Sequence, residues 1–444
     1  MQIDISFKRI QQLAIPAILS GIAEPILSAT DAAVVGNIPI TGTESLAAVG
    51  IVGTFLSTII WILAQTRSAI SAIISQNLGA GKIDSIKTFP AQAILFNVLL
   101  SVFLLFSTYF FVTEIFVFFK AKGSILTYSL EYYYIRVWGF PLTLFTFAVF
   151  GIFRGLQNTF YPMIIAIIGA LLNIGLDFIL VYGINNLIEP MGVKGAAWAS
   201  LIAQTVMTLL SLLFLLKKTN VSLKIKKKIH PEIKRLVFMS VNLFVRSIAL
   251  NIALIIATRE ATALGKEYIA AHTIAMNLWL FSAFFIDGYG AAGNILGGRL
   301  LGAKDYKNLI LLTKRVTLYN LLIAIFLILT GFALYNHIGA VFTNDKPVLA
   351  VFYSIFYIVL LSQPFNALGF TLDAVFKGLG EMKYLRNILL ASTFLGFIPA
   401  LLIGNYFNLK LKGIWIALVV WIAFRATALI IKFKNKYMIR SKLK

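Results

Sequence analysis

Long apolar segments, separated by short polar ones, run from one end of the chain to the other. Segments such as 93–112 and 318–334 have the roughly 17–25 residues that a helix needs to cross a hydrocarbon core of about 30 Å. The pattern predicts an all-α integral membrane protein with twelve transmembrane helices. These helices are expected to start near residues 10, 47, 90, 126, 161, 193, 236, 268, 315, 348, 385 and 412. Twelve helices in 444 residues leave no room for a soluble domain of ordinary size.

The composition supports the membrane interpretation and excludes several kinds of site. Hydrophobic residues make up 59% of the chain and charged residues 13%, whereas soluble domains contain about 25% charged residues. The chain has no cysteine, which excludes disulfides, thiol nucleophiles and cysteine-based metal sites. Its three histidines are far apart, and no GxSxG, P-loop or HExxH motif occurs. We therefore expect neither an enzyme nor a metal site, and no ATP-driven pump.

The net charge of +22 raises the question of a nucleic-acid partner, and the positions of the charges answer it. If the N-terminus is cytoplasmic, most lysines and arginines fall at the two termini and in the loops after even-numbered helices, with the largest cluster at 217–235. This asymmetry predicts a multi-pass protein of the plasma membrane, the bacterial inner membrane, with both termini in the cytoplasm. We expect the basic segments to contact anionic lipid headgroups and no nucleic acid.

The two halves of the chain repeat each other in order. Four short motifs of the first half recur 218 to 228 residues later, at 29–32 and 257–260, 78–80 and 301–303, 153–156 and 376–379, and 194–195 and 412–413. Because this offset spans six helices, an even number, both halves enter the membrane from the same side, as in a parallel repeat. We predict an N-lobe at 1–216, a basic cytoplasmic linker at 217–235, a C-lobe at 236–432 and a basic cytoplasmic tail at 433–444. Two six-helix lobes around a central cavity suit a secondary transporter.

Two carboxylates interrupt the first apolar segment, where each costs roughly 2.5–3.5 kcal/mol or more at the bilayer centre. Glu24 and Asp31 are seven residues apart, so a helix places both on one face. Asn173 and Asp177 share a helical face in the same way, and Asp31 can meet them across the lobe. Such oxygens suit a hard cation, and two carboxylates in a low dielectric favour sharing a proton. The alternative is that these acids pair with a buried arginine or cap a helix near its outer end.

Two prolines remove backbone hydrogen bonds from the same segment. Pro16 and Pro25 are candidate hinges, although static kinks explain them equally well. Glu24 either lines a cavity or hydrogen-bonds the turn that Pro25 disrupts. Tyr134 and Trp138 are candidates to line a cavity for aromatic cations, and otherwise face lipid or other helices.

The second half also carries charges inside its predicted helices, and such charges mark functional candidates that need a partner. They are Arg259, Glu260, Asp287 and Asp373. We expect Arg259 to pair with Asp287 or Asp373, either in a functional role or as an ion pair that only holds the lobe together. Arg259 occupies the position in the repeat that Asp31 occupies in the first half, so the fold does not itself require a carboxylate there.

Distinctive short motifs lie along the whole chain. In the first half they are AIP at 14–16, EPIL at 24–27, Asp31 followed by VVG at 34–36, QNLGA at 76–80, FRG at 153–155, Asn173 with Asp177, and KGAA at 194–197. In the second half they are IAAH at 269–272, FIDG at 285–288 and LDA at 372–374. Together they resemble the multidrug and toxic compound extrusion (MATE) family and, within it, the DinF-type branch. The chain departs from the family at Ala32, where a threonine is usual, and so lacks a hydroxyl beside Asp31.

The resemblance implies two six-helix bundles in a V shape. It also implies a monomer that exports amphiphilic, often cationic small molecules in exchange for H⁺ or Na⁺, with no other cofactor. By position, Asp31, Asn173, Asp177 and Ser200 match the family's N-lobe cation-binding residues, and Glu24 matches a polar position that lines the cavity. A lipid-linked-oligosaccharide flippase of the same superfamily is the alternative, which needs several arginines facing the cavity. A membrane-embedded lipid enzyme is a third possibility, although it gives no reason for a two-lobe repeat.

Overall fold

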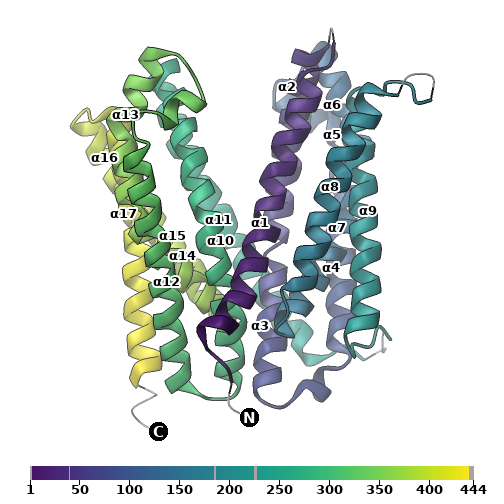
Figure 1. The fold of residues 1–444 in the computed structure, drawn as a ribbon, viewed down its shortest axis with the longest axis vertical. Coiled ribbons are helices and arrows are strands. Elements are labelled where there is room, and N and C mark those ends of the chain that lie inside the picture. The colour runs from purple at the N-terminus through teal and green to yellow at the C-terminus, as the bar shows by residue number, and fades with distance from the viewer. Residues whose placement is uncertain (1–2, 40, 185–186, 225–227, 440–444) are drawn as a thin grey trace. The chain divides into compact units, whose positions relative to one another are not determined.

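The computed structural model describes residues 3–39, 41–184, 187–224 and 228–439, apart from the side chains of Glu24, Pro25, Ser28 and Ala29. Helices make up most of this part of the chain, which contains no β-strand (Figure 1). The helices of the first half are α1 (Phe7–Gly36), α2 (Gly42–Leu63), α3 (Thr66–Gly79), α4 (Phe89–Tyr109), α5 (Val112–Phe118), α6 (Gly123–Arg136), α7 (Gly139–Gly155), α8 (Phe160–Tyr182) and α9 (Val193–Lys218). Those of the second half are α10 (Pro231–Ala263), α11 (Lys266–Gly302), α12 (Tyr306–Ala333), α13 (Lys346–Leu361), α14 (Gln363–Gly378), α15 (Met382–Ala391), α16 (Ile398–Tyr406) and α17 (Lys410–Phe433).

Long apolar helices account for the predicted membrane spans. Among the described residues, nine helical segments are long and apolar enough to cross a membrane. Two further spans are bent pairs, α6 with α7 and α13 with α14. The helix α1, with 30 residues, is also long enough to cross a membrane. The all-α membrane fold predicted from the sequence is confirmed.

Prolines lie next to both bends. The axes of α6 and α7 differ by 47° just before Pro141, and those of α13 and α14 differ by 49° beside Pro364. A proline has no N–H to donate and its ring clashes with the carbonyl four residues earlier, so it bends a helix. By contrast, α1 continues as one helix through Pro16 and Pro25. The hinge role of these two residues stays a prediction, and the Pro25 side chain lies outside the described residues.

The start of α12 shows why hydropathy alone misplaces some helix ends. This helix begins at Tyr306, nine residues before the predicted start, and polar residues at 307–308 and 313–315 interrupt the apolar pattern of its first turns. Asp305 caps it, because its carboxylate accepts a hydrogen bond from the backbone N–H of Asn308 at 3.0 Å. A capped helix continues through polar residues that an apolar pattern does not include.

The chain divides into two compact units, each made of several segments. The N-terminal unit contains Leu19–Ile74 and Lys82–Ser240, and the C-terminal unit contains Met1–Ile18, Ser75–Gly81 and Val241–Lys444. The start of α1 and the end of α3 thus pack with the second half of the chain. The lobe boundaries predicted from the sequence, at 216 and 236, stay predictions beside this division.

In the N-terminal unit, α8 and α9 lie side by side, α7 packs against α4 and α9, and α6 packs against α2 and α9 (Figure 1). Tyr133 of α6 is fully buried in the core of this unit. Its hydroxyl donates a hydrogen bond to Thr108 Oγ1 of α4 at 2.6 Å. This packing holds α8, which carries Asn173 and Asp177, between α1 and α9.

In the C-terminal unit, α11 packs along α12, α13 and α14, and α17 packs against α14 and α16. Trp421 of α17 is buried, and its indole N–H donates to Thr393 Oγ1 at 3.1 Å. The ends of α3 and α11 cross at closely spaced backbones. A Cβ atom on Gly302 would lie only 1.9 Å from the carbonyl oxygen of Gln76, and one on Gly79 only 1.8 Å from that of Arg299.

Adding one methyl group at this crossing is expected to destabilise the protein. Gly302→Ala forces the two backbones apart, at a cost of about 1–3 kcal/mol, because neither neighbouring carbonyl can rotate away as a side chain does. The matched control is Gly50→Ala in α2, where an added Cβ meets nothing within 4 Å and the change is neutral or slightly stabilising. Thermal unfolding of both variants in detergent measures the difference. Equal melting temperatures would contradict the close crossing.

Candidate functional site

A pair of buried carboxyls lies between α1 and α8. Asp31 is 9% exposed and Asp177 is fully buried, and their carboxyl groups are close enough to interact directly. Asn173 precedes Asp177 by one helical turn, and its amide donates a hydrogen bond to Asp177 Oδ2 at 3.0 Å. The structure thus brings together three of the four residues expected to form the cation site.

Several oxygens at this pair have no partner. Asp31 Oδ1 and Asp177 Oδ1 are buried and accept no hydrogen bond from any described residue. Ser200, the fourth expected residue, is buried on α9, which packs against α8, and its hydroxyl also has no partner among the described residues. Buried polar atoms in native proteins are rarely left unsatisfied, so these oxygens indicate a site for a proton, a cation or water.

A positive charge lies near the carboxyl pair. Arg136, at the end of α6, interacts electrostatically with Asp177, and its guanidinium lies 5.9 Å from the ring centre of Tyr132. Tyr132 is buried and interacts with both Asp31 and Asp177. Arg136 is not among the residues that the sequence pattern singles out. Arg136 lies ten residues into the fourth predicted helix, and a charge inside a predicted membrane helix is a signal that marks it as a functional candidate.

Two of the three residues predicted to line a substrate cavity lie beside one aromatic ring, and neither lines the groove described below. Tyr134 and Trp138 are exposed, and both pack beside Tyr109, at ring-centre distances of 5.1 and 6.5 Å. The side chain of Glu24 lies outside the described residues. The cavity role of these residues stays a prediction.

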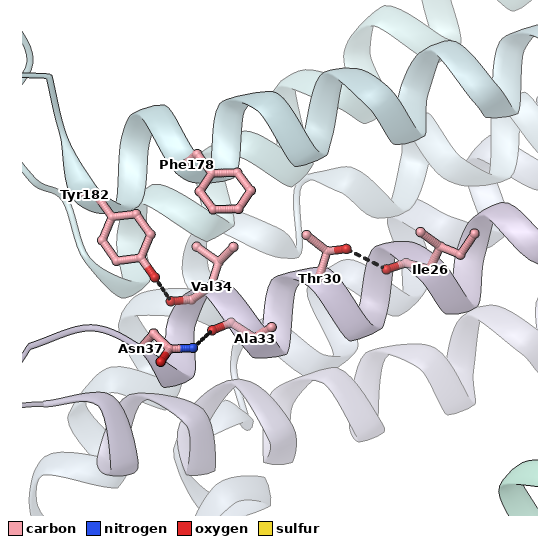
Figure 2. Close-up of a pocket in the computed structure, with 7 residues that line it drawn as sticks. All are labelled: Ile26, Thr30, Ala33, Val34, Asn37, Phe178 and Tyr182. Atoms are coloured by element: carbon pink, nitrogen blue, oxygen red, sulfur yellow. Dashed lines mark hydrogen bonds between the residues drawn. The ribbon is translucent and has the colours of Figure 1, made fainter. Parts of the chain in front are cut away.

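An apolar groove lies on α1 and α8, on another face of the helices that carry the carboxyl pair. Its volume is about 460 Å³, and Figure 2 shows the residues that line it: Ile26, Thr30, Ala33, Val34, Asn37, Phe178 and Tyr182. The Tyr182 hydroxyl donates to the Val34 carbonyl at 2.7 Å and so ties the two helices together. Asp31 directly follows Thr30, and Asp177 directly precedes Phe178. Groove and carboxyl pair therefore share both helices.

The charges of the second half form a different partnership from the one predicted. Asp373 pairs with Arg246 at 2.6 Å, with Lys377 at 3.1 Å and with Arg425 at 3.5 Å. Arg259 forms no ion pair with Asp287 or Asp373 among the described residues, so the predicted pairing of Arg259 with either carboxylate is wrong. The distance of 127 residues between Arg246 and Asp373 explains why helical spacing could not reveal it.

The other charged candidates of the second half lie apart from this group or at its edge. Arg259 is exposed on α10, and its neighbour Glu260 accepts a hydrogen bond from the Asn405 amide at 3.2 Å. Asp287 is exposed on α11 and interacts electrostatically with Lys377. The structure thus separates the four candidates into two places.

Comparison with known proteins decides the family. The MatE family model matches residues 16–179 and 243–402, which is nearly three quarters of the chain. The chain belongs to the MatE family. The two matched segments of this MatE protein, one in each half, agree with the repeat predicted from the sequence.

Curated relatives of this MatE protein include proteins from bacteria and from plants. Protein DETOXIFICATION 43 of Arabidopsis thaliana is 28% identical over 69% of this chain and 57% of its own length, so the chain spans little more than half of that relative. DNA damage-inducible protein F of Escherichia coli strain K12 is 25% identical over 96% of this chain and 91% of its own length. The probable multidrug resistance protein NorM of Thermotoga maritima is 23% identical over 96% of this chain and 92% of its own length.

Solved structures share the MatE fold over almost the whole chain. A MATE crystal structure in the bent conformation covers 98% of this chain and 96% of its own, with a TM-score of 0.90 at 21% identity. A Vibrio cholerae MATE transporter in the bent form covers 98% of this chain and 97% of its own, with a TM-score of 0.89 at 18% identity. At these identities the likeness shows the fold alone.

Occupation of the carboxyl pair is expected to stabilise the protein. A cation at ten times its dissociation constant stabilises the folded state by about 1.4 kcal/mol, or a few degrees in melting temperature. If Na⁺ binds, replacing choline by Na⁺ at constant ionic strength is expected to raise the melting temperature. If H⁺ binds, lowering the pH is expected to raise it. Asp177→Asn is expected to lose this response and Glu114→Gln, at an exposed carboxylate of α5, to keep it. Identical responses of all three proteins would place the ion elsewhere.

Proposed function

We propose that this MatE protein is a secondary antiporter that exports amphiphilic small molecules, cations among them, in exchange for H⁺ or Na⁺. Asp31 and Asp177 are the coupling carboxyls. The observation that carries this proposal is the buried pair itself, with one oxygen of each carboxyl lacking a partner and with Asn173 holding Asp177 in place. The chain acts as a monomer in the plasma membrane, the bacterial inner membrane, with both termini in the cytoplasm.

Coupling follows from the cost of charge in a low dielectric. Two carboxylates that face each other away from water repel, and an empty pair is therefore unstable unless it takes up a proton or a cation. Loading neutralises the pair and releases α1 and α8 from that repulsion. Since the loaded and empty pairs differ in free energy, the ion gradient favours a different arrangement of the two helices in each state, which is the requirement for alternating access.

Substrate chemistry is inferred from the groove on the same two helices. Its wall is largely apolar, with the hydroxyls of Thr30 and Tyr182 and the amide of Asn37 as polar groups (Figure 2). A groove of this size and character suits the apolar body of an amphiphilic molecule. The bacterial relatives named as multidrug resistance proteins support the same substrate class.

Transport in proteoliposomes tests the coupling role of Asp31. The wild-type protein is expected to export an amphiphilic fluorescent cation when a pH gradient or a Na⁺ gradient is imposed separately, which also identifies the ion. Asp31→Asn removes one carboxyl of the pair and is expected to lose at least 90% of gradient-driven export, while Glu114→Gln, an exposed acid on α5, retains it. Normal export by Asp31→Asn, at equal reconstitution, would rule out Asp31 as the coupling group.

Turnover is expected to depend on the positive charge of Arg136. Arg136→Gln removes the cation that interacts with Asp177, which makes the empty, negatively charged pair costlier by about 1 kcal/mol or more. Ion release, and with it turnover, is expected to slow about five- to tenfold. Arg136→Lys keeps the charge and is expected to restore most of the rate. If Gln and Lys variants turn over equally, the charge at this position has no role in coupling.

A further inference from the structure

The C-terminal unit contains a buried group of charges that the coupling scheme does not use. This α14 charge cluster consists of Arg246 on α10, Asp373 and Lys377 on α14, and Arg425 on α17. Both arginines and the aspartate are buried, with Arg425 only 2% exposed, and the Lys377 side chain is 16% exposed. The three cationic side chains all contact the carboxylate of Asp373.

The cluster holds more positive than negative charge. Three cations share Asp373, and among the described acids Asp287 of α11 is the other carboxylate that interacts with the cluster, through Lys377. Even with both carboxylates ionised, one positive charge of the cluster has no counter-ion among the described residues. A buried charge without a partner costs several kcal/mol, so a native fold rarely keeps one.

One donor of the cluster is free. Arg425 Nη1 is buried and has no hydrogen-bond partner in the described part of the chain, while its Nη2 lies 3.5 Å from Asp373. Guanidinium groups are the usual protein ligands for carboxylate and phosphate oxygens, because their planar donors match those oxygens in geometry. An acceptor oxygen at Arg425 Nη1 would satisfy both the free donor and the excess charge.

Aromatic rings adjoin the cluster. The Arg425 guanidinium lies 5.9 Å from the ring centre of Phe370 and 5.2 Å from that of Trp421. Phe370 also contacts Trp279 at 5.6 Å, and both of these rings are half-buried. A molecule whose anionic group reaches Arg425 could therefore place an aromatic or apolar body against Phe370 and Trp279.

We propose that the α14 charge cluster binds the carboxylate or phosphate group of a small anionic molecule. We also propose that the protein transports molecules with such a group in addition to its cationic substrates. The binding step stands on the cluster alone, whereas the transport step rests on the proposed antiport function. The cluster gives the C-terminal unit an excess of positive charge, opposite in sign to the carboxyl pair of the N-terminal unit.

Binding is tested on the purified full-length protein in detergent, with benzoate, inorganic phosphate, phosphatidylglycerol and tetraphenylphosphonium as probes. We expect benzoate or phosphate to raise the melting temperature and to bind in calorimetry. Arg425→Met is expected to weaken that binding at least tenfold, and Lys377→Gln to weaken it less. Arg259→Met, which removes an exposed arginine of the same unit, serves as the matched control and is expected to leave binding unchanged.

The stability of Arg425→Met without any anion separates this proposal from a purely structural ion network. If an anion normally balances the cluster, the variant loses an uncompensated charge and is expected to melt at the same or a higher temperature than wild type in anion-poor buffer. If the cluster only holds helices together, the variant melts lower and soluble anions have no effect, which overturns the proposal. Stabilisation by phosphatidylglycerol alone would assign the cluster to a lipid headgroup and likewise overturn it.

Failure of this proposal is distinguishable from failure of the antiport function. Asp31→Asn is expected to bind benzoate as wild type does, because Asp31 belongs to the other unit. If that variant abolishes export and binding remains, both proposals stand. If the wild-type protein binds benzoate but does not export it when an ion gradient is imposed, the cluster binds anions that the protein does not transport. The proposal that anionic molecules are substrates is then wrong.

Discussion

Charged side chains inside this helical bundle are expensive because little water reaches them, and this constraint organises both units. An acid or base buried among apolar helices must find an opposite charge, a hydrogen bond or a bound ion. The N-terminal unit meets the constraint incompletely: Asn173 holds one oxygen of Asp177, but Asp31 and Asp177 each keep an oxygen without a partner. The C-terminal unit meets it in excess, with three cations at Asp373. In each unit the remaining imbalance is the basis of the ligand site that we propose there.

The two units therefore share one helical architecture, but their buried charged groups have opposite net charge. The repeated motifs and the family match in both halves show that the architecture itself is duplicated. The charged residues are not duplicated with it, since the repeat counterpart of Asp31 is the exposed Arg259. The two halves therefore share their helical packing but differ in the charged residues that this packing positions.

How far the sequence predicts this protein depends on the range of each interaction. Helices were predictable because the apolar segments are long, and the hydrogen bond from Asn173 to Asp177 was foreseeable because it joins residues one turn apart. Arg246 and Asp373 lie 127 residues apart, and nothing in the local pattern distinguishes Arg246 from Arg259 as the partner of Asp373. The bends near Pro141 and Pro364 had a local signal that hydropathy does not read. Arg136 became significant only when packing placed it near Asp177.

The hydrogen bond from Asn173 has a consequence for coordination number. With Oδ2 of Asp177 already accepting from the amide, Oδ1 of Asp177 and Oδ1 of Asp31 are the oxygens of the pair that are buried without partners in the described part of the chain. A hard metal cation prefers more oxygen ligands than these two, so Na⁺ at the proposed coupling site would keep part of its hydration shell. A proton needs only two oxygens to bridge and could enter fully dehydrated. Dehydration would therefore be a larger part of the cost of binding for Na⁺ than for a proton at the proposed coupling site.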